Sequence, residues 1–313
     1  MFAVIGAAGF VGAALTTRLA AGPEPVRILV RDEGRARARL GAAAQAVELV
    51  VGDMHDERAL DSLLAGTRAV YTTAQTVTAR QPAGAGDFAT AERRAADLVL
   101  AAAARHRVGR LVTVGLIGAS GEATNPWVRS RADLERSLLA GPVPATVLRP
   151  GLVVGRGSVG FDGLVTAAGK STAVIRGSGR QRWSYIALAD LVGYLVDVVD
   201  LPAAAGQVFD VGSEEAPTYR ELVARTAHLL GRRAPRLLPL PLPLLRAAAP
   251  VVERAQGMPA GGLRAAIAHL GDDLVGDTAP VRALLPRELA GWDAAAGAAL
   301  AATTASDAAS PRR

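Results

Sequence analysis

The feature that most constrains this chain is a short apolar run that leads directly into three evenly spaced glycines. Residues 2–5 have the apolar character of a buried strand, and Gly6, Gly9 and Gly12 follow, opening a helix-patterned stretch at 11–19. A strand, a glycine turn and a helix in this order are typical of a dinucleotide-binding β-α-β unit. The first glycine permits the tight turn, the second lets a pyrophosphate approach the backbone, and the third lets helix and strand pack closely.

The first half of the chain alternates short β-branched runs with Ala-rich helical stretches. Apolar strand patterns occur at 2–5, 26–30, 49–51, 69–72, 111–114 and 146–148. This alternation predicts an α/β fold with a Rossmann-like, doubly wound parallel sheet. The strands are apolar almost throughout, which indicates burial on both faces. The second half is less regular and predicts a smaller, mostly helical C-terminal substrate lobe. In it, Thr218 with Glu221 three residues later predicts a capping box at the start of a helix, and the Pro-Leu alternation at 238–245 is not expected inside a helix.

These patterns also predict how the chain is divided. We expect a dinucleotide-binding domain at 1–155, to which residues 184–212 return. The substrate lobe is expected from 156–183 and 213–302. Residues 303–313 are small and polar and are expected to form a flexible tail.

Composition excludes several kinds of site. The chain has no cysteine, so disulfides, thiolate nucleophiles and thiolate-bound metals are absent. Its four histidines are scattered without metal-ligand spacing, and we expect no metal site. The N-terminus lacks a basic, apolar leader, and no apolar run approaches the roughly 20 residues of a spanning helix. The chain is therefore expected to be cytoplasmic.

The charge balance raises the question of a nucleic-acid partner. The chain has 35 Lys and Arg against 29 Asp and Glu, and its isoelectric point is near 10.5. Because the arginines are interspersed with acidic residues and no nucleic-acid-binding motif is present, we expect no specific nucleic-acid partner. The oligomeric expectation is a monomer or a homodimer.

Further motifs follow the glycine turn in a fixed order. They are VIGAAGFVG at 4–12, LVRD at 29–32, VVGDMHD at 50–56, WVRSRADLERSL at 127–138, VLRPGLVVGRGS at 147–158, WSYIALADLVGYLV at 183–196 and VFDVGS at 208–213. Over about residues 1–230 this series resembles the short-chain dehydrogenase/reductase superfamily, in its atypical, extended and NmrA-like branches. The resemblance implies a bound nicotinamide dinucleotide.

The resemblance also implies which residues contact the cofactor. They are Gly6, Gly9, Phe10, Val11, Gly12, Arg31, Asp32, Asp53, Met54, Thr73, Ala74, Gln75, Arg131, Pro150 and Gly151. Asp53 has an equally good alternative role as a helix N-cap.

Two neighbouring residues bear on the choice of cofactor. Arg31 is the first residue after the second predicted strand, where an arginine accommodates the 2′-phosphate of NADP. Asp32 follows, and an acid in this region binds the 2′-hydroxyl of NAD. We favour NADP(H) over NAD(H). The alternative is that Arg31 belongs to a solvated helix face.

The catalytic positions depart from the pattern of the resembled superfamily. Trp127 stands where its members carry a catalytic tyrosine, and Arg131 stands where they carry a lysine. An indole is a donor without acid/base chemistry, so alcohol–ketone chemistry through a tyrosine is not expected. Tyr185 is a candidate replacement acid, although a packing role is the simpler interpretation.

Two functions fit this pattern. The first is an NADP(H)-dependent atypical reductase that transfers hydride to a small apolar quinone, enone or carbonyl compound. Hydride delivery to a quinone or an activated alkene yields a delocalised anion that water can protonate. The second is a non-catalytic, NmrA-like dinucleotide-binding redox sensor or accessory protein, which the substitutions at Trp127 and Arg131 favour.

Overall fold

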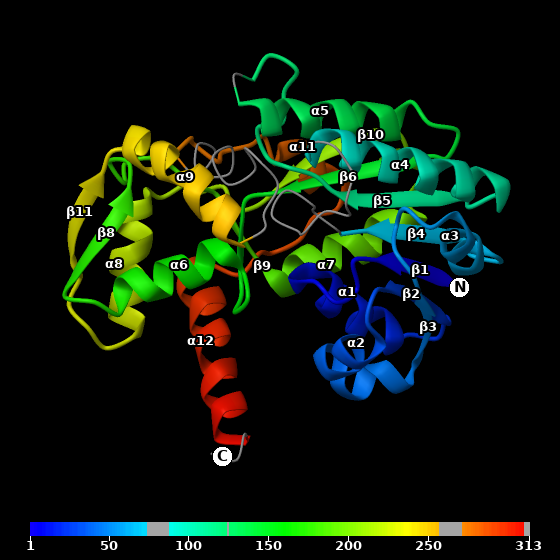
Figure 1. Ribbon diagram of the computed structural model, residues 1–313. Coiled ribbons are helices and arrows are strands. Elements are labelled where there is room, and N and C mark those ends of the chain that lie inside the picture. Colours follow the sequence, from blue (N-terminus) through cyan, green and yellow to red (C-terminus); the bar gives the residue numbers. More distant parts are fainter. Residues whose placement is uncertain (74–87, 124, 257–270, 310–313) are drawn as a thin grey trace. The chain divides into compact units, whose positions relative to one another are not determined.

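The computed structural model describes residues 1–73, 88–123, 125–256 and 271–309 (Figure 1). The chain forms two compact units. The first contains Met1–Arg149, Val192–Phe209 and the stretch that begins at Ala249. The second contains Pro150–Leu191, Asp210–Ala248 and the C-terminal part of the chain. The stretch at Ala249 is a difference from the predicted division, which gave residues 213–302 to one lobe.

Six strands of a seven-stranded sheet come from the N-terminal half of the chain, and the seventh comes from the second half. The strands are β1 (Phe2–Ile5), β2 (Val26–Val30), β3 (Val47–Val51), β4 (Ala69–Thr72), β5 (Arg110–Val114), β6 (Ala145–Pro150) and β10 (Gln207–Val211). They lie in the order β10-β6-β5-β4-β1-β2-β3, and the pairs formed among β1 to β6 are parallel. The Rossmann-like α/β fold predicted from the strand pattern is confirmed.

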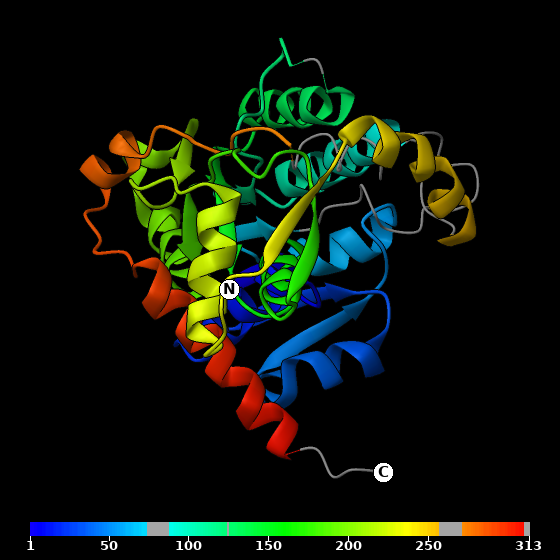
Figure 2. The same cartoon turned by 90° about the vertical axis from the view of Figure 1, so that its left-hand side faces the viewer.

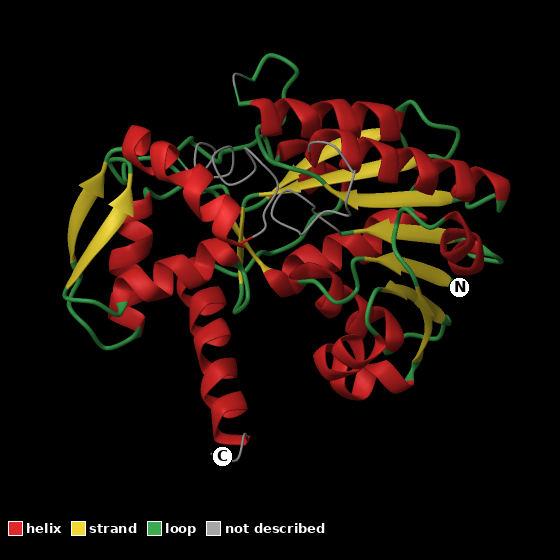
Figure 3. Cartoon of the chain, viewed as in Figure 1, coloured by secondary structure: helices red, strands yellow, loops and turns green. Residues whose placement is uncertain are grey.

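Helices cover both faces of this sheet, as Figure 3 shows. They are α1 (Phe10–Ala20), α2 (Glu33–Leu40), α3 (Glu57–Leu64), α4 (Phe88–Arg105), α5 (Pro126–Leu139) and α7 (Leu188–Asp197). One buried cluster joins Leu60 and Leu63 of α3 to Val99 of α4, Leu134 of α5 and Val70 of β4. Burial of this aliphatic layer fixes α3, α4 and α5 on one face.

The second unit combines short strands with helices. Its elements are β7 (Leu152–Val154), α6 (Val159–Ala168), β8 (Thr172–Arg176), β9 (Tyr185–Ala187), α8 (Tyr219–Leu229), β11 (Arg236–Leu240), α11 (Ala279–Leu284) and α12 (Trp292–Ala309). Strands β7 and β9 pair in parallel, as do β8 and β11. The mostly helical lobe expected from the sequence is present, together with these two small sheets. Helix α9 (Leu242–Gln256) follows β11.

Two local expectations have different outcomes. The predicted capping box at Thr218 and Glu221 is present at the start of α8. The expected tail is helical from Thr303 to Ala309, where it forms the end of α12, and its flexibility stays a prediction. Within the described parts of the chain, no helix combines the length and the hydropathy needed to cross a bilayer.

Candidate functional site

The glycine turn lies between the carboxyl end of β1 and the first turn of α1. Gly6 has φ of 90°, a left-handed conformation that favours glycine. The Gly9 amide donates to the Gly6 carbonyl oxygen at 2.9 Å, which closes the turn. Gly9 is the N-cap of α1, and no side chain caps the helix there. The first N–H groups of α1, including those of Phe10 and Val11, therefore remain available to an anion.

Gly12 shows why this turn requires glycine. A Cβ at position 12 would overlap the Gly6 carbonyl oxygen and lie 2.6 Å from Thr73 Oγ1. Thr73 follows β4, and its hydroxyl lies 3.3 Å from the Ile5 carbonyl oxygen. The turn is therefore packed at the point where β1 and β4 neighbour each other and the strand order reverses. Open parallel sheets bind ligands at this topological switch point.

The end of β2 carries the residues that bear on cofactor choice. Asp32 is the N-cap of α2, and its Oδ1 accepts from the Arg35 amide at 2.8 Å. The Arg31 side chain is exposed and has no ion pair within the described residues. The local arrangement therefore gives Asp32 a structural partner and leaves the Arg31 guanidinium open to solvent.

Asp53 follows β3 and is partly buried. Its Oδ1 accepts from the His55 amide at 3.0 Å. The N-cap of α3 is Asp56, which accepts from the Arg58 and Ala59 amides. Asp56 is therefore the N-cap of α3, and Asp53 does not have the N-cap role that was its alternative interpretation.

Three further residues were predicted to contact the cofactor. Met54 is partly buried and packs against the aliphatic cluster under α3. Ala74 and Gln75 lie outside the described residues.

Helix α5 places Trp127 and Arg131 on its buried side. Trp127 is 7% exposed and packs against Ala89 and Leu116. Arg131 is 3% exposed, and its Nη1 lies 3.2 Å from Oε1 of Glu92 on α4. Arg131 Nη2 also donates to the Val114 carbonyl oxygen at 3.0 Å. The Arg131 guanidinium thus has protein partners at the carboxyl end of β5, and its predicted contact with a cofactor stays a prediction.

One turn farther along α5, a second buried carboxylate holds another arginine. Glu135 is 1% exposed, and its Oε1 accepts from the Leu116 amide at 3.0 Å. Its Oε2 binds Arg149 Nε at 2.7 Å and Nη2 at 2.6 Å. The Arg149 side chain remains 20% exposed at the end of β6. These two contacts hold the Arg149 guanidinium in a fixed orientation at the carboxyl end of β6.

The site reasoning from the sequence did not include Glu92 or Glu135. Arg131 and Glu135 are four residues apart, a spacing that places both on one helix face. This spacing was the available signal for Glu135. No local pattern indicates Glu92, which is distant in the sequence and meets Arg131 only through the packing of α4 on α5.

A small cavity adjoins the buried ion pair. Its volume is about 30 Å³, and its polar lining comes from Thr72, Thr113, Glu92 and Arg131. The Thr72 hydroxyl donates to Thr113 Oγ1 at 2.7 Å. A cavity of this size with several polar groups has room for a water molecule.

The second unit contains the remaining predicted residues. Gly151 follows Pro150, and a Cβ at position 151 would lie 2.5 Å from the Ser184 carbonyl oxygen. Tyr185 is buried, its hydroxyl donates to Glu215, and it accepts from the Trp292 amide at 2.8 Å. Burial, with a smaller contribution from the Glu215 hydrogen bond, raises the Tyr185 pKa to about 12. These partners match the packing interpretation of Tyr185, and its role as an acid stays a prediction.

The residues present fit a dinucleotide phosphate at the turn of β1 and α1. Backbone amides at a helix N-terminus and a glycine cradle that a Cβ would fill are suited to a phosphate group. Within the described ranges, no three His, Asp or Glu residues are grouped so as to hold a metal ion.

Two proteins with assigned names are similar to this chain in sequence. The chain is 28% identical over 251 residues to ceramide reductase of Caulobacter vibrioides, which covers 80% of this chain and 77% of that protein. It is also 28% identical over 235 residues to (4-alkanoyl-5-oxo-2,5-dihydrofuran-3-yl)methyl phosphate reductase of Streptomyces griseus, covering 74% of each.

Solved structures show the same fold. The NADPH complex of the quinone oxidoreductase from Escherichia coli has a TM-score of 0.69 at 20% identity, covering 94% of this chain and 97% of that one. UDP-glucose 4-epimerase from Thermotoga maritima, solved with UDP-glucose, has a TM-score of 0.72 at 15% identity, covering 97% and 99%. Residues 6–161 match the family described as NAD(P)H-binding. The chain therefore belongs to the NAD(P)H-binding family, and its glycine turn is part of the matched region.

Proposed function

We propose that this chain is an NADP(H)-dependent reductase that transfers hydride to a small apolar quinone, enone or carbonyl compound. The observation that carries the proposal is the glycine turn at the switch point of the sheet, where Gly12 leaves no room for a side chain. Both relatives are named reductases, one of ceramide and the other of a (4-alkanoyl-5-oxo-2,5-dihydrofuran-3-yl)methyl phosphate. Bound NADPH would supply the hydride.

The chain's own residues would bind the cofactor and orient charge. The free amides at the start of α1 would hold the pyrophosphate, and Arg31 would bind the 2′-phosphate. At the ends of β5 and β6, Glu135 fixes the Arg149 guanidinium, which is suited to stabilising negative charge that develops on an acceptor oxygen. Hydride addition to a quinone or an enone gives a delocalised anion that takes its proton from water, so Trp127 in place of a tyrosine is compatible with these two acceptors.

The cofactor preference rests on Arg31. Replacing it with alanine should weaken NADPH binding by about 10- to 100-fold, the range for losing a charge-assisted hydrogen bond. NADH binding should change little, because NADH has no 2′-phosphate. Calorimetry with both cofactors measures this difference. Arg39→Ala on the exposed side of α2 is the matched control, and an equal loss for NADPH and NADH would contradict the assignment.

A second candidate function is a non-catalytic dinucleotide-binding sensor. The observation that favours it is the burial of Arg131 against Glu92, which gives this cation protein partners. Turnover separates the two functions. NADPH oxidation should be followed with a panel of quinones, enones and apolar ketones on the protein used for calorimetry. If the protein binds NADPH tightly but no acceptor oxidises the bound NADPH, the reductase proposal is contradicted and the sensor function is favoured.

A further inference from the structure

The net positive charge of this chain is accounted for by two stretches that are distant in the sequence. Residues 163–189 and 222–252 contain no Asp or Glu, yet they hold nine of the 35 Lys and Arg residues. The formal net charge of the whole chain is +6, so the remainder of the chain carries −3. The excess of positive charge therefore lies entirely in these two stretches.

The fold brings the two stretches together as neighbouring strands. β8 lies within the first stretch and β11 within the second, and the two strands lie side by side (Figure 2). They pair in parallel, with Val174 opposite Leu238. Val174 is 64% exposed and Leu238 is 40% exposed. The alternate residues Ala173 and Ile175 on β8 are buried. The strand pair thus buries one side of β8 and exposes adjacent aliphatic side chains on the other.

Exposed basic side chains lie close in sequence to these aliphatic residues, at and before the starts of β8 and β11. Lys170 precedes β8, Arg233 precedes β11, and Arg236 begins it, and all three are exposed. Within the described part of the chain, none of these three side chains has an ion-pair partner. Arg232 is exposed too, and its Nη1 donates to the Gly169 carbonyl oxygen at 2.7 Å. An aliphatic centre with a cationic border and no acidic group in either strand segment is an amphiphilic surface.

We propose that this surface, formed by Lys170, Val174, Arg233, Arg236 and Leu238, docks on a bilayer that contains anionic lipid. Basic side chains are attracted to anionic headgroups, and short aliphatic side chains insert at the boundary between headgroups and acyl chains. Single-stranded nucleic acids are typically held by aromatic side chains that stack on bases, whereas this face presents Val174 and Leu238. The observations therefore favour a lipid surface over a nucleic acid. This inference is independent of the proposed reductase activity.

Vesicle sedimentation of the full chain tests the proposal. The protein should sediment with phosphatidylglycerol–phosphatidylcholine vesicles at low salt and not with pure phosphatidylcholine vesicles. Binding should be lost near 1 M salt, where charges are screened beyond about 3 Å. The variant Arg233→Glu/Arg236→Glu should weaken vesicle binding by at least about 25-fold, since each basic residue near an anionic surface contributes about fivefold.

Two further variants separate the contributions. Arg18→Glu/Arg94→Glu makes the same charge change at exposed positions of α1 and α4 and should bind vesicles at least half as well as the unchanged protein. Val174→Thr/Leu238→Thr leaves the charge of the protein unchanged, and threonine is well tolerated in strands. This variant should weaken vesicle binding because it removes the aliphatic groups that insert into the bilayer. Circular dichroism melting establishes that each variant is folded.

Several results would overturn the proposal. They are equal binding to neutral and anionic vesicles, an equal loss in the α1 and α4 control, and full binding by the threonine variant. Salt-sensitive binding to single-stranded DNA without vesicle binding would show that this surface binds nucleic acid and not lipid.

Discussion

Gly12 shows how strongly a single position is determined by its surroundings. Its α-carbon faces the Gly6 carbonyl oxygen and the Thr73 hydroxyl, both of which belong to the ends of parallel strands. A methyl group there would force the helix α1 away from β1. Because glycine has no Cβ, a phosphate can also approach the backbone of the turn. The packing of α1 on β1 and the binding of a phosphate therefore both require glycine at this position.

Gly12→Ala should therefore lower both stability and cofactor affinity. We expect a loss of about 1–3 kcal/mol in the free energy of unfolding, the usual cost of overpacking, and a loss of measurable NADPH binding. Urea unfolding and calorimetry measure the two effects. Gly163→Ala on α6 is the control, since a Cβ there meets nothing within 4 Å and alanine favours a helix by about 1 kcal/mol. NADPH binding by Gly12→Ala at unchanged affinity would contradict the role of this position.

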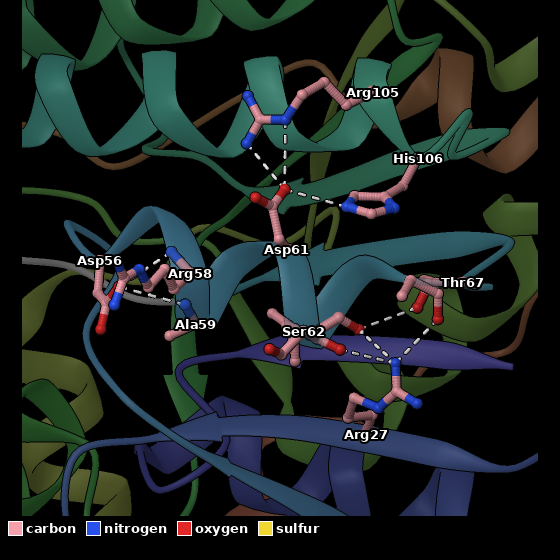
Figure 4. A network of polar contacts seen from close by, with 11 residues as sticks. Arg27, Asp56, Arg58, Ala59, Asp61, Ser62, Thr67, Arg105 and His106 are labelled. Carbon is pink, nitrogen blue, oxygen red and sulfur yellow. Dashed lines mark hydrogen bonds and ion pairs between the residues drawn. The ribbon is translucent and has the colours of Figure 1, made fainter.

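At the scale of elements, α3 is held in place by polar contacts at its sides and end (Figure 4). Arg27 extends from β2, and its Nη1 donates to the carbonyl oxygens of Ser62 and Ala65 at 2.9 Å each. On the other side, Asp61 accepts from Arg105 at 2.8 Å and lies 3.0 Å from His106 Nε2. The last carbonyls of a helix lack intrahelical donors, and Arg27 satisfies them from a neighbouring strand.

Arg27→Ala should destabilise the protein by about 2 kcal/mol, because it removes charge-assisted hydrogen bonds to the end of α3. Urea unfolding is the measurement. Arg37→Ala is the comparison, since Arg37 forms an exposed pair with Glu33 on one helix and its loss should cost no more than about 0.5 kcal/mol. Equal effects of the two substitutions would show that capping by Arg27 contributes nothing beyond an exposed ion pair.

The elements themselves were mostly predictable where a local pattern specified them. The strand runs and the capping box at Thr218 needed only neighbouring residues. The Pro-Leu alternation at 238–245 was harder, because it is divided between β11 and the start of α9. Strand β11 pairs with β8, which lies some 60 residues earlier in the sequence, and no local signal reports a partner at that distance.

At the scale of the molecule, one ion network connects the N-terminus to distant parts of the first unit. Arg68, which precedes β4, binds Glu24 at 2.6 Å and Asp200 at 2.7 Å. The Met1 amino group also binds Glu24, at 3.0 Å. The hydrogen bond from Arg68 is the main cause of a Glu24 pKa lowered from 4.5 to about 2, and the N-terminal amino group adds to it.

This network predicts a pH dependence of stability. The folded pKa of Glu24 lies below its unfolded value, so its stabilising contribution is present above about pH 4.5 and is lost as pH falls towards 2. Glu24→Gln should lower stability at neutral pH by about 1 kcal/mol and flatten the acid limb of the stability curve. Urea unfolding from pH 2 to 7 measures the curve. Glu57→Gln on α3 is the control, and parallel curves for wild type and Glu24→Gln would contradict the prediction.

The sequence alone determined the Rossmann-like fold and the glycine turn, because both depend on residues that are adjacent in the chain. Strand periodicity and the spacing of Gly6, Gly9 and Gly12 are local properties. Only the tertiary structure decided that Arg131 meets Glu92, that Glu135 holds Arg149, and that two acid-free stretches form one basic, aliphatic face. Buried ion pairs and surface patches depend on contacts between distant segments, and those contacts exist only once the sheets and helices have packed.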